Sequence, residues 1–440
     1  MQSLSLRQTR LTINCDQKLT RVVTSFVENA GICFGLEPES ALDLTLASEE
    51  IFNYLSFTGV QGEQLTLTCR QGGYFVDLEF EFHSEEFGLS MFNLTAANSV
   101  ENENAVLETG LLIASRLVDR FSFFRRDSLS MLILEKEKSY PTMGENPEKQ
   151  PGPLKNSVIK RPDLEEVKLF VRYVTQNYDA CVVPSSFQTP GKVADMVQYG
   201  HYDVAIASDN SGAIGGGIVW TWKNEKLVEF FGPFVFGQPE HSTIPVELAD
   251  HMISSIARTT AMGLMTQSPS PDLPSDYFEP LGAISSIKPG QESCESNSYY
   301  RHLREDPGTS VWAHRLIEEF LIEEYRKHVL ARRINLVTSE GENKSQDSVI
   351  ATELDKSISK ATLKPIWWGH DALSLLHAHI RALVQEGVFN IFFEMDLGRP
   401  WECHFTTSLL GSGFEPRLVL PYAGSSDILI FQHIGSAGVL

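Results

Sequence analysis

The chain has 440 residues, of which 42% are hydrophobic and 10% aromatic, so it can build more than one stable hydrophobic core. Its 57 acidic and 36 basic residues give a formal net charge of -21. Binding to a phosphate backbone needs a concentrated basic surface, so this charge argues against a nucleic-acid partner. The length predicts two or three domains.

The N-terminal residues and the cysteines indicate the cellular compartment. Residues 1–14 lack the apolar core of a signal peptide, and no window holds about 18 uninterrupted apolar residues, the length of a membrane span. The six cysteines lie far apart with no C-x-x-C pair, so neither a zinc site nor a disulfide framework is indicated. We therefore expect an unexported, cytoplasmic chain with reduced thiols and no membrane contact.

The first segment, residues 8–137, combines both kinds of periodicity. Alternating residues predict strands, with Gly72 and Gly73 as a hairpin turn, and apolar residues recurring every three or four positions predict helices. The predicted strands are 10–15, 63–71, 74–82, 120–126 and 128–136. The predicted helices are 16–34, a long helix from Pro38, and 105–121. This order of elements predicts an α/β sandwich.

The long helix carries a polar pair, Glu49 and Asn53, which are four residues apart and therefore share a face. With Ser48 they match the S-E-x-x-x-N pattern of the anti-sigma-factor serine kinases, which belong to the GHKL ATPase superfamily. Residues 8–137 also resemble that family in the order of their elements, with Gly110 in the place of a lid glycine.

This resemblance implies a site and partners. Glu49 would be the catalytic base, Asn53 would bind Mg²⁺ and ATP, and Gly110 would contact the nucleotide, as phosphoryl transfer requires positioning and charge neutralisation. The resemblance also implies a protein partner, either a sigma factor or an anti-sigma antagonist, and by analogy a homodimer.

Two departures from the family pattern favour a degenerate module. The adenine-reading D-x-G-x-G aligns with residues 82–86, where Phe82 and Ser84 replace the aspartate and the first glycine. A phenylalanine cannot accept a hydrogen bond from the adenine amino group. Glu108 replaces the first lid glycine and adds negative charge where a triphosphate would lie. Glu49 and Asn53 are accordingly either a solvated polar pair or part of a live kinase site.

A run rich in proline, glycine and charge, residues 138–156, predicts a solvated linker with almost nothing to bury. After it, residues 157–290 show two helices, an antiparallel meander, a long helix from Pro245 and the closing sequence DYFEPLGAI at 276–284. The glycine cluster at 212–217 precedes a strand instead of a helix, which argues against a Rossmann phosphate loop.

This order and the closing sequence resemble the GNAT acetyltransferases. The resemblance implies acetyl-CoA, with its pyrophosphate on backbone N–H groups of the loop 237–245, a proton-donating tyrosine at Phe278 or neighbouring Tyr277, and Glu229 as a base. The loop has no G-x-G, and its two prolines lack an N–H. The segment is therefore either an N-acetyltransferase or a degenerate relative.

The third segment, residues 298–440, follows a weaker break at 285–298. It predicts a helix over 310–333, then strands, and then a helix over 372–387 that Gly387 ends. Its close, with Gly413 and Phe414 matching the family's terminal G-F, again resembles a GNAT domain. His370 and His377 lie seven residues apart, unlike the i, i+4 spacing of zinc pairs on helices, so metal binding is disfavoured.

Together the predictions give an α/β (α+β) chain. Its parts are a GHKL-type α/β sandwich at 8–137, a linker at 138–156, and two GNAT-like α/β domains at 157–290 and 298–440. We interpret the chain as a regulatory protein with degenerate ATP and acetyl-CoA sites that acts through protein binding. The alternative is an active enzyme, either an ATP-dependent protein serine kinase or an acetyl-CoA-dependent N-acetyltransferase.

Overall fold

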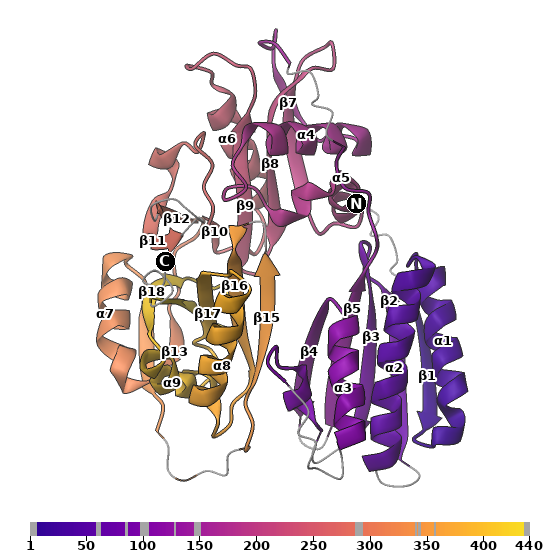
Figure 1. Cartoon of the computed structure of the whole chain (residues 1–440). Coiled ribbons are helices and arrows are strands. Elements are labelled where there is room, and N and C mark those ends of the chain that lie inside the picture. The colour runs from indigo at the N-terminus through magenta and orange to yellow at the C-terminus, as the bar shows by residue number, and fades with distance from the viewer. Residues whose placement is uncertain are drawn as a thin grey trace. The chain divides into compact units, whose positions relative to one another are not determined.

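A computed structural model describes most of the chain, and Figure 1 shows its elements. The described residues are 7–58, 63–83, 87–96, 105–126, 129–144, 151–286, 294–338, 341, 345–355 and 358–434. The chain divides into two compact units, residues 1–140 with 347–351 (unit 1) and residues 141–346 with 352–440 (unit 2). Both units contain sheets and helices, so the predicted mixed α/β class is confirmed.

Unit 1 is a five-stranded antiparallel sheet with three helices over one face (Figure 1). The strand order is β1-β2-β3-β5-β4. The strands are β1 (Gln8–Asn14), β2 (Gln64–Gln71), β3 (Phe75–His83), β4 (Arg120–Arg126) and β5 (Leu129–Glu137). The helices are α1 (Thr20–Cys33), which follows the short helix η1 (Gln17–Leu19), α2 (Pro38–Thr58) and α3 (Ala105–Leu117).

Two local predictions in unit 1 are confirmed. The apolar stripe of α2 is buried, because Leu44, Ala47, Ile51 and Leu55 lie in the core. The hairpin between β2 and β3 is also present, with Gly73 in the left-handed region at a φ of 87°. That conformation carries little cost for glycine, which explains why a glycine stands there.

Unit 2 begins with a seven-stranded sheet in the order β11-β12-β10-β9-β8-β7-β6. The strands are β6 (Val158–Lys160), β7 (Asp203–Ser208), β8 (Ile214–Trp222), β9 (Leu227–Val235), β10 (Gly263–Thr266), β11 (Glu279–Ser286) and β12 (Cys294–His302). The helices are α4 (Leu164–Asn177), α5 (Pro190–Gln198) and α6 (Ile244–Ile256). We call this region, residues 157–302, the first half of unit 2. Its sheet extends past residue 290, because β12 pairs with both β10 and β11.

The second half of unit 2 contains a five-stranded sheet in the order β15-β16-β17-β19-β18, in which residues 349–351 at the start of β15 are counted with unit 1, and a parallel pair, β13 with β14. The strands are β13 (Thr309–Ala313), β14 (Arg332–Leu336), β15 (Val349–Asp355), β16 (Lys360–Trp367), β17 (Asn390–Asp396), β18 (Phe414–Leu420) and β19 (Ile428–His433). The helices are α7 (Glu318–Lys327), α8 (Ala372–Gln385) and α9 (Thr406–Gly411).

The predicted helix over 310–333 is wrong at both ends, because α7 ends at Lys327 and residues 332–333 belong to β14. Residues 309–313 form β13, in which Val311 and Ala313 alternate with more exposed residues, and α7 begins only at Glu318. Parallel pairing with β14 favours the strand, because it buries those two side chains and pairs their backbone. The end predicted for the helix over 372–387 is confirmed, with Gly387 at a φ of 75° directly after α8.

The two halves follow one plan of strands. In the first half β9 runs parallel to β10, and β12 pairs antiparallel with both β10 and β11. In the second half β16 runs parallel to β17, and β19 pairs antiparallel with both β17 and β18. Each parallel pair is bridged by a long helix, α6 or α8. This is the doubled arrangement that the sequence predicts.

The halves also share one hydrophobic core. The buried members from the first half are Leu227, Met265, Leu281 and Tyr300, and those from the second half are Phe392, Leu418, Leu420, Tyr422 and Ile430. Gln432 of β19 fastens the contact, because its side chain accepts from the Ser285 N–H at 3.1 Å and donates to the Ser285 carbonyl at 2.5 Å. The two halves therefore fold as one compact unit.

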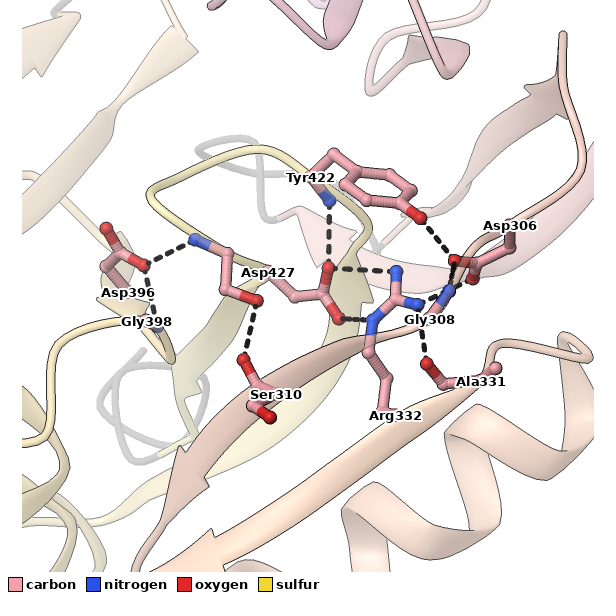
Figure 2. Close-up of polar contacts among 10 residues, drawn as sticks. Asp306, Gly308, Ser310, Ala331, Arg332, Asp396, Gly398, Tyr422 and Asp427 are labelled. Carbon is pink, nitrogen blue, oxygen red and sulfur yellow. Dashed lines mark hydrogen bonds and ion pairs between the residues drawn. The ribbon is translucent and has the colours of Figure 1, made fainter.

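A buried ion cluster holds the second half together (Figure 2). The Arg332 side chain is fully buried and donates to Asp427 at 2.6 Å and to Asp306 at 2.5 Å. The Tyr422 N–H donates to Asp427 at 2.9 Å, and the Tyr422 hydroxyl donates to Asp306. Burial alone would raise the pKa of Asp306, but the hydrogen bonds from Tyr422, Gly308 and Arg332 hold it below its usual value.

Candidate functional site

A hollow of about 610 Å³ lies beside Asn53 in unit 1. Its walls come from η1, the start of α1 and the C-terminal half of α2, and its lining residues are Gln17, Lys18, Thr20, Arg21, Glu49, Glu50 and Asn53. Glu49 and Asn53 both line it, so the structure brings the predicted pair together. The Asn53 side-chain carbonyl accepts a hydrogen bond from the Thr20 hydroxyl at 3.1 Å.

The third predicted site residue, Gly110, lies elsewhere. It is on α3 and faces Glu50, since a Cβ added at Gly110 would collide with the Glu50 carboxylate. Tyr54, four residues after Glu50, accepts the N–H of Gly88 at 3.0 Å. Successive residues of a helix turn by about 100°, so Glu49 and Asn53 face α1 and Tyr54 faces α3, whereas Glu50 lies between them, beside both the hollow and Gly110. The structure does not bring Gly110 together with the other two.

The described residues of unit 1 do not fit Mg-ATP. The Asn53 carbonyl, which would bind the metal, already accepts a hydrogen bond, and α3 packs directly on α2 at Gly110. Phe82, at the adenine-reading position, is buried against Phe87 with 5.3 Å between ring centroids, and Ser84 lies outside the described residues. Within the described ranges, no three His, Cys, Asp or Glu side chains are grouped to hold a metal ion. We therefore derive no phosphoryl-transfer step for this unit.

In the first half of unit 2, the chain itself covers the loop 237–243 that leads into α6. The Gln238 side chain accepts the Leu154 N–H at 3.0 Å, and its amide donates to the Phe236 carbonyl at 2.9 Å. Gly237, with a φ of 58°, lies so close to the Pro151 carbonyl that a Cβ would collide with it. By resemblance this loop would hold the pyrophosphate of acetyl-CoA, and here the linker lies against it.

Near the end of the predicted linker, Pro151 and Leu154 are half-buried, whereas residues 152, 153, 155 and 156 are exposed. Leu154 packs on the hydrophobic core of the first half, and its side chain would lie 2.6 Å from a Cβ at Gly215. The physical reason is that one apolar side chain among prolines and glycines is enough to anchor a short segment, since burying a leucine contributes about 2 kcal/mol.

Side chains of the same chain also cover the C-terminal end of β9. Only Leu227, Val228 and Glu229 pair with β10, so the strand continues to Val235 without that neighbour. The Val235 N–H donates to the Tyr178 hydroxyl at 2.5 Å and to Asp272 at 3.1 Å, and the Ser270 hydroxyl donates to the Pro233 carbonyl. Burial, and then the hydrogen bond to Asp272, raise the pKa of Tyr178 well above its usual value. This backbone edge is therefore satisfied by side chains of the same chain.

The candidate acid and base of the first half also have partners. Glu229 is 9% exposed and forms an ion pair with Lys223 at 3.3 Å, and this carboxylate raises the pKa of Lys223 above its usual value. Phe278 is buried against Phe230, with 4.9 Å between ring centroids, so no hydroxyl stands at that position. Neighbouring Tyr277 lies 5.6 Å from the Arg301 guanidinium. The Glu229 carboxylate is thus already engaged by a cation of the same chain.

A second hollow, of about 240 Å³, lies in the second half. It is lined by His314, Trp368, Gly369, His370, Ala372, His404, Thr407 and Ser408. The rings of Trp368 and His404 stack with 4.4 Å between centroids. Burial lowers the pKa of His314, whose Nδ1 accepts the Leu316 N–H at 3.2 Å.

Sequence reasoning identified only part of this hollow. It singled out His370, but it paired it with His377, which is not among the lining residues. It missed His314 and His404, which come from separate elements before and after the histidine-rich stretch. No spacing rule joins residues that only tertiary folding brings together.

No protein-family model matches the sequence, and no curated protein matches it. Among solved structures, a GNAT-family acetyltransferase from Staphylococcus aureus Mu50 is 15% identical with a TM-score of 0.26, and the match covers 34% of this chain and 99% of that one. An aminoglycoside 6'-N-acetyltransferase complexed with coenzyme A is 9% identical with a TM-score of 0.26, over 34% and 99% of the two chains.

A phosphinothricin acetyltransferase of the GNAT superfamily from Sinorhizobium meliloti, in complex with AcCoA, is 15% identical with a TM-score of 0.25 and covers 34% of this chain and 89% of its own. These neighbours are similar to about a third of this chain. At such TM-scores the similarity carries no argument about activity or substrate. None of the described helices is long and apolar enough to cross a membrane.

Proposed function

We propose that this chain is a regulatory protein that acts through protein contacts and transfers neither acetyl nor phosphoryl groups. The observation that carries the proposal is the cover on the loop 237–243, where the Pro151 carbonyl lies against Gly237 and the Gln238 side chain binds the Leu154 N–H, in the space that a pyrophosphate would need. Two prolines at 239 and 245 remove further N–H donors from the same region. Acetyl-CoA would have to displace residues 151–155, and the loop would still lack two of the backbone N–H donors that bind a pyrophosphate.

The surface of unit 1 supports the protein-binding part of the proposal. The outward face of α2 exposes Leu42, Leu46 and Phe57, whose exposed fractions are 51%, 40% and 65%. Leu42 and Leu46 are neighbours one helical turn apart, and an exposed apolar pair is available to a protein partner. By resemblance the partner would be a sigma factor or an anti-sigma antagonist, and the setting would be the cytoplasm.

The alternative is an acetyl-CoA-dependent N-acetyltransferase, and one observation favours it. Glu229 stands at the last residue that β9 pairs with β10, where the two strands part and a substrate could enter between them. In that case Glu229 would act as the base after release from Lys223.

Calorimetric titration with CoA and with acetyl-CoA separates these functions. We expect no saturable heat with the full chain, and no rise in melting temperature, since a ligand that binds only the folded state must raise it. The decisive variant is Leu154→Asp, which frees residues 151–155 from the core. Its matched control is Leu164→Asp, on the exposed side of α4.

We expect neither variant to bind CoA, because the prolines of the loop still lack N–H groups. Saturable binding by the unmodified chain would overturn the proposal. CoA binding by Leu154→Asp alone would show that the loop 237–243 can still bind the cofactor. The linker would then be a cover over a functional site.

A further inference from the structure

Strand β14 has an edge that no other described strand covers. It pairs with β13 alone, in a two-stranded parallel sheet. Two hydrogen bonds fix the register, from the Thr309 N–H to the Ala331 carbonyl at 3.1 Å and from the Val337 N–H to the Ala313 carbonyl at 2.9 Å. Both backbone groups of every second residue in a strand point to the same side, so residues 331, 333, 335 and 337 face β13.

The N–H and carbonyl groups of Arg332, Ile334 and Leu336 point the other way, and we call them the β14 edge. Within the described ranges, no backbone group bonds to those of Ile334 or Leu336. Leu336 is 40% exposed, so solvent reaches this part of the strand. Unpaired groups in such a row are a template for a further strand, because each N–H and C=O can bond to an added chain.

Charge or short length protects two other edge strands of the chain. β4 carries three arginines among its seven residues, and β6 has only three residues. β14 carries its two arginines at the start and continues as Ile334, Asn335 and Leu336, without a charge or a proline. The C-terminal part of the β14 edge therefore has neither of these protections.

The side chains along β14 determine which added strand fits. The Arg332 side chain points into the buried ion cluster (Figure 2). Because side chains alternate along a strand, Ile334 and Leu336 lie on that same face and Arg333 lies on the opposite one. Arg333 is exposed and forms no ion pair within 4.0 Å with any residue that the structure describes. One face of the strand thus offers a cation and the other offers apolar side chains.

We propose that the β14 edge binds an extended segment of a partner protein as an added strand, and that this segment alternates acidic with apolar residues. Its backbone bonds to that of Ile334 and Leu336, its carboxylates lie beside Arg333, and its apolar side chains lie beside Leu336. Opposite charges and apolar pairs on neighbouring strands stabilise their pairing. The inference rests on the proposed function, in which the chain acts through protein contacts, and it adds a surface in unit 2 to the one on α2.

Fluorescence anisotropy of the full chain with a labelled heptapeptide of alternating glutamate and valine tests this inference. We expect saturable binding with a dissociation constant below about 1 mM. A peptide with lysine in place of glutamate binds about threefold more weakly, because like charges on neighbouring strands repel each other. Two further peptides carry N-methyl groups, one on its valines and the other on its glutamates. Only every second N–H of an added strand faces β14, so we expect one of these two peptides to lose binding and the other to keep it.

Leu336→Pro is the decisive variant, because it removes an N–H that points away from β13 and leaves the bonds to β13 in place. We expect the dissociation constant for the glutamate peptide to rise about tenfold or more. The matched control is Thr12→Pro, which removes an N–H that points away from β2 in the edge strand β1. This control binds the peptide like the unmodified chain.

Arg333→Glu gives a second test that does not depend on a proline. We expect this variant to bind the lysine peptide more tightly than the glutamate peptide, a reversal that a loss of stability cannot produce. Its matched control is Arg258→Glu, at an exposed arginine in the first half of unit 2. The control keeps the preference for the glutamate peptide.

Three results would each overturn the inference. The first is no saturable binding of the glutamate peptide at about 1 mM. The second is binding of both N-methylated peptides. The third is binding of the glutamate peptide by Leu336→Pro and Arg333→Glu with the affinity of the unmodified chain.

These outcomes are separable from those of the CoA titration. A chain that binds neither CoA nor the glutamate peptide loses the β14 contact and keeps the proposed function. A chain that binds both loses the proposed function, and the contact at the β14 edge remains.

Discussion

The two halves of unit 2 share a plan of strands but differ in what fills their centres. The first half packs phenylalanines, with Phe170 6.4 Å from Phe187 and 6.1 Å from Phe236 between ring centroids. The second half also packs phenylalanines, with Phe393 5.5 Å from Phe405 between ring centroids, but it buries a charge cluster as well, with Arg332 between Asp306 and Asp427. Strand order therefore does not dictate core chemistry. An apolar core loses stability in proportion to the area removed, whereas an ion cluster fails when one member is removed.

The two halves also differ in the loop that leads into the long helix between the parallel strands. In the first half the linker covers the loop before α6. In the second half a histidine-lined hollow opens before α8, with Gly369 and His370 in its wall. Corresponding positions in the two halves are thus covered by the chain in the first half and open in the second.

The largest expected effect comes from removing the central cation of the ion cluster. Arg332→Met leaves Asp306 and Asp427 buried without their partner, and we expect the free energy of unfolding to fall by about 3–5 kcal/mol. Urea denaturation measures this fall. The control is Lys364→Met, which removes a cation from the more exposed pair with Glu353 and costs less than about 1 kcal/mol. Equal losses of the free energy of unfolding in the two variants would show that the buried ion cluster contributes no more than an exposed ion pair.

The next effect depends on pH. Glu402 is buried beside Asp396, and burial raises its pKa from 4.5 to about 7. A raised pKa means that the fold favours the protonated form, so this contribution is complete below pH 4.5 and is lost as the pH rises through about 7. The loss is at most about 3 kcal/mol, at about 1.4 kcal/mol per pKa unit.

Glu402→Gln abolishes this loss, because glutamine does not ionise. We expect the free energy of unfolding of the variant to rise relative to that of the unmodified chain as the pH increases from about 5 to 8. Urea denaturation at each pH measures this difference. Glu415→Gln, at an exposed carboxylate, gives the baseline. Stability curves that stay parallel for the Glu402 variant and the unmodified chain would show that this carboxyl is ionised in the fold throughout.

The smallest effect concerns the covered loop. Gly237→Ala forces a Cβ toward the Pro151 carbonyl and also strains a φ of 58°, and we expect a loss of about 2 kcal/mol. We also expect faster amide exchange at Leu154, measured by hydrogen–deuterium exchange. Gly200→Ala is the control, since its φ is 80° and nothing lies within 4 Å of the added Cβ. If exchange at Leu154 is the same in both variants, the linker does not rest on this loop.

Sequence reasoning succeeded where the signal is local. The hairpin at Gly73, the end of α8 at Gly387 and the buried stripe of α2 each depend on residues that are neighbours in the chain. It failed at β12, whose residues CESNSYYRH are mostly polar and read as a break. That strand is held by pairing with β10 and β11, which no local pattern reveals.

The candidate sites show the same limit. Spacing correctly placed Glu49 and Asn53 on one face, but it could not say which neighbouring helix that face meets. In the structure Tyr54 faces α3, and Glu50, one residue after Glu49, lies beside Gly110. A rotation of about 100° about the helix axis separates these two arrangements, and packing alone decides between them.

The core shared by the two halves determines whether either half can fold alone. A gene break after His302 would leave Leu227, Met265 and Tyr300 facing water on one product and would bare Phe392 and Leu418 on the other. Neither product could fold as an independent domain unless its newly exposed apolar residues were replaced by polar ones. The two halves therefore form one folding unit, and a substitution in this core on either side lowers the stability of both.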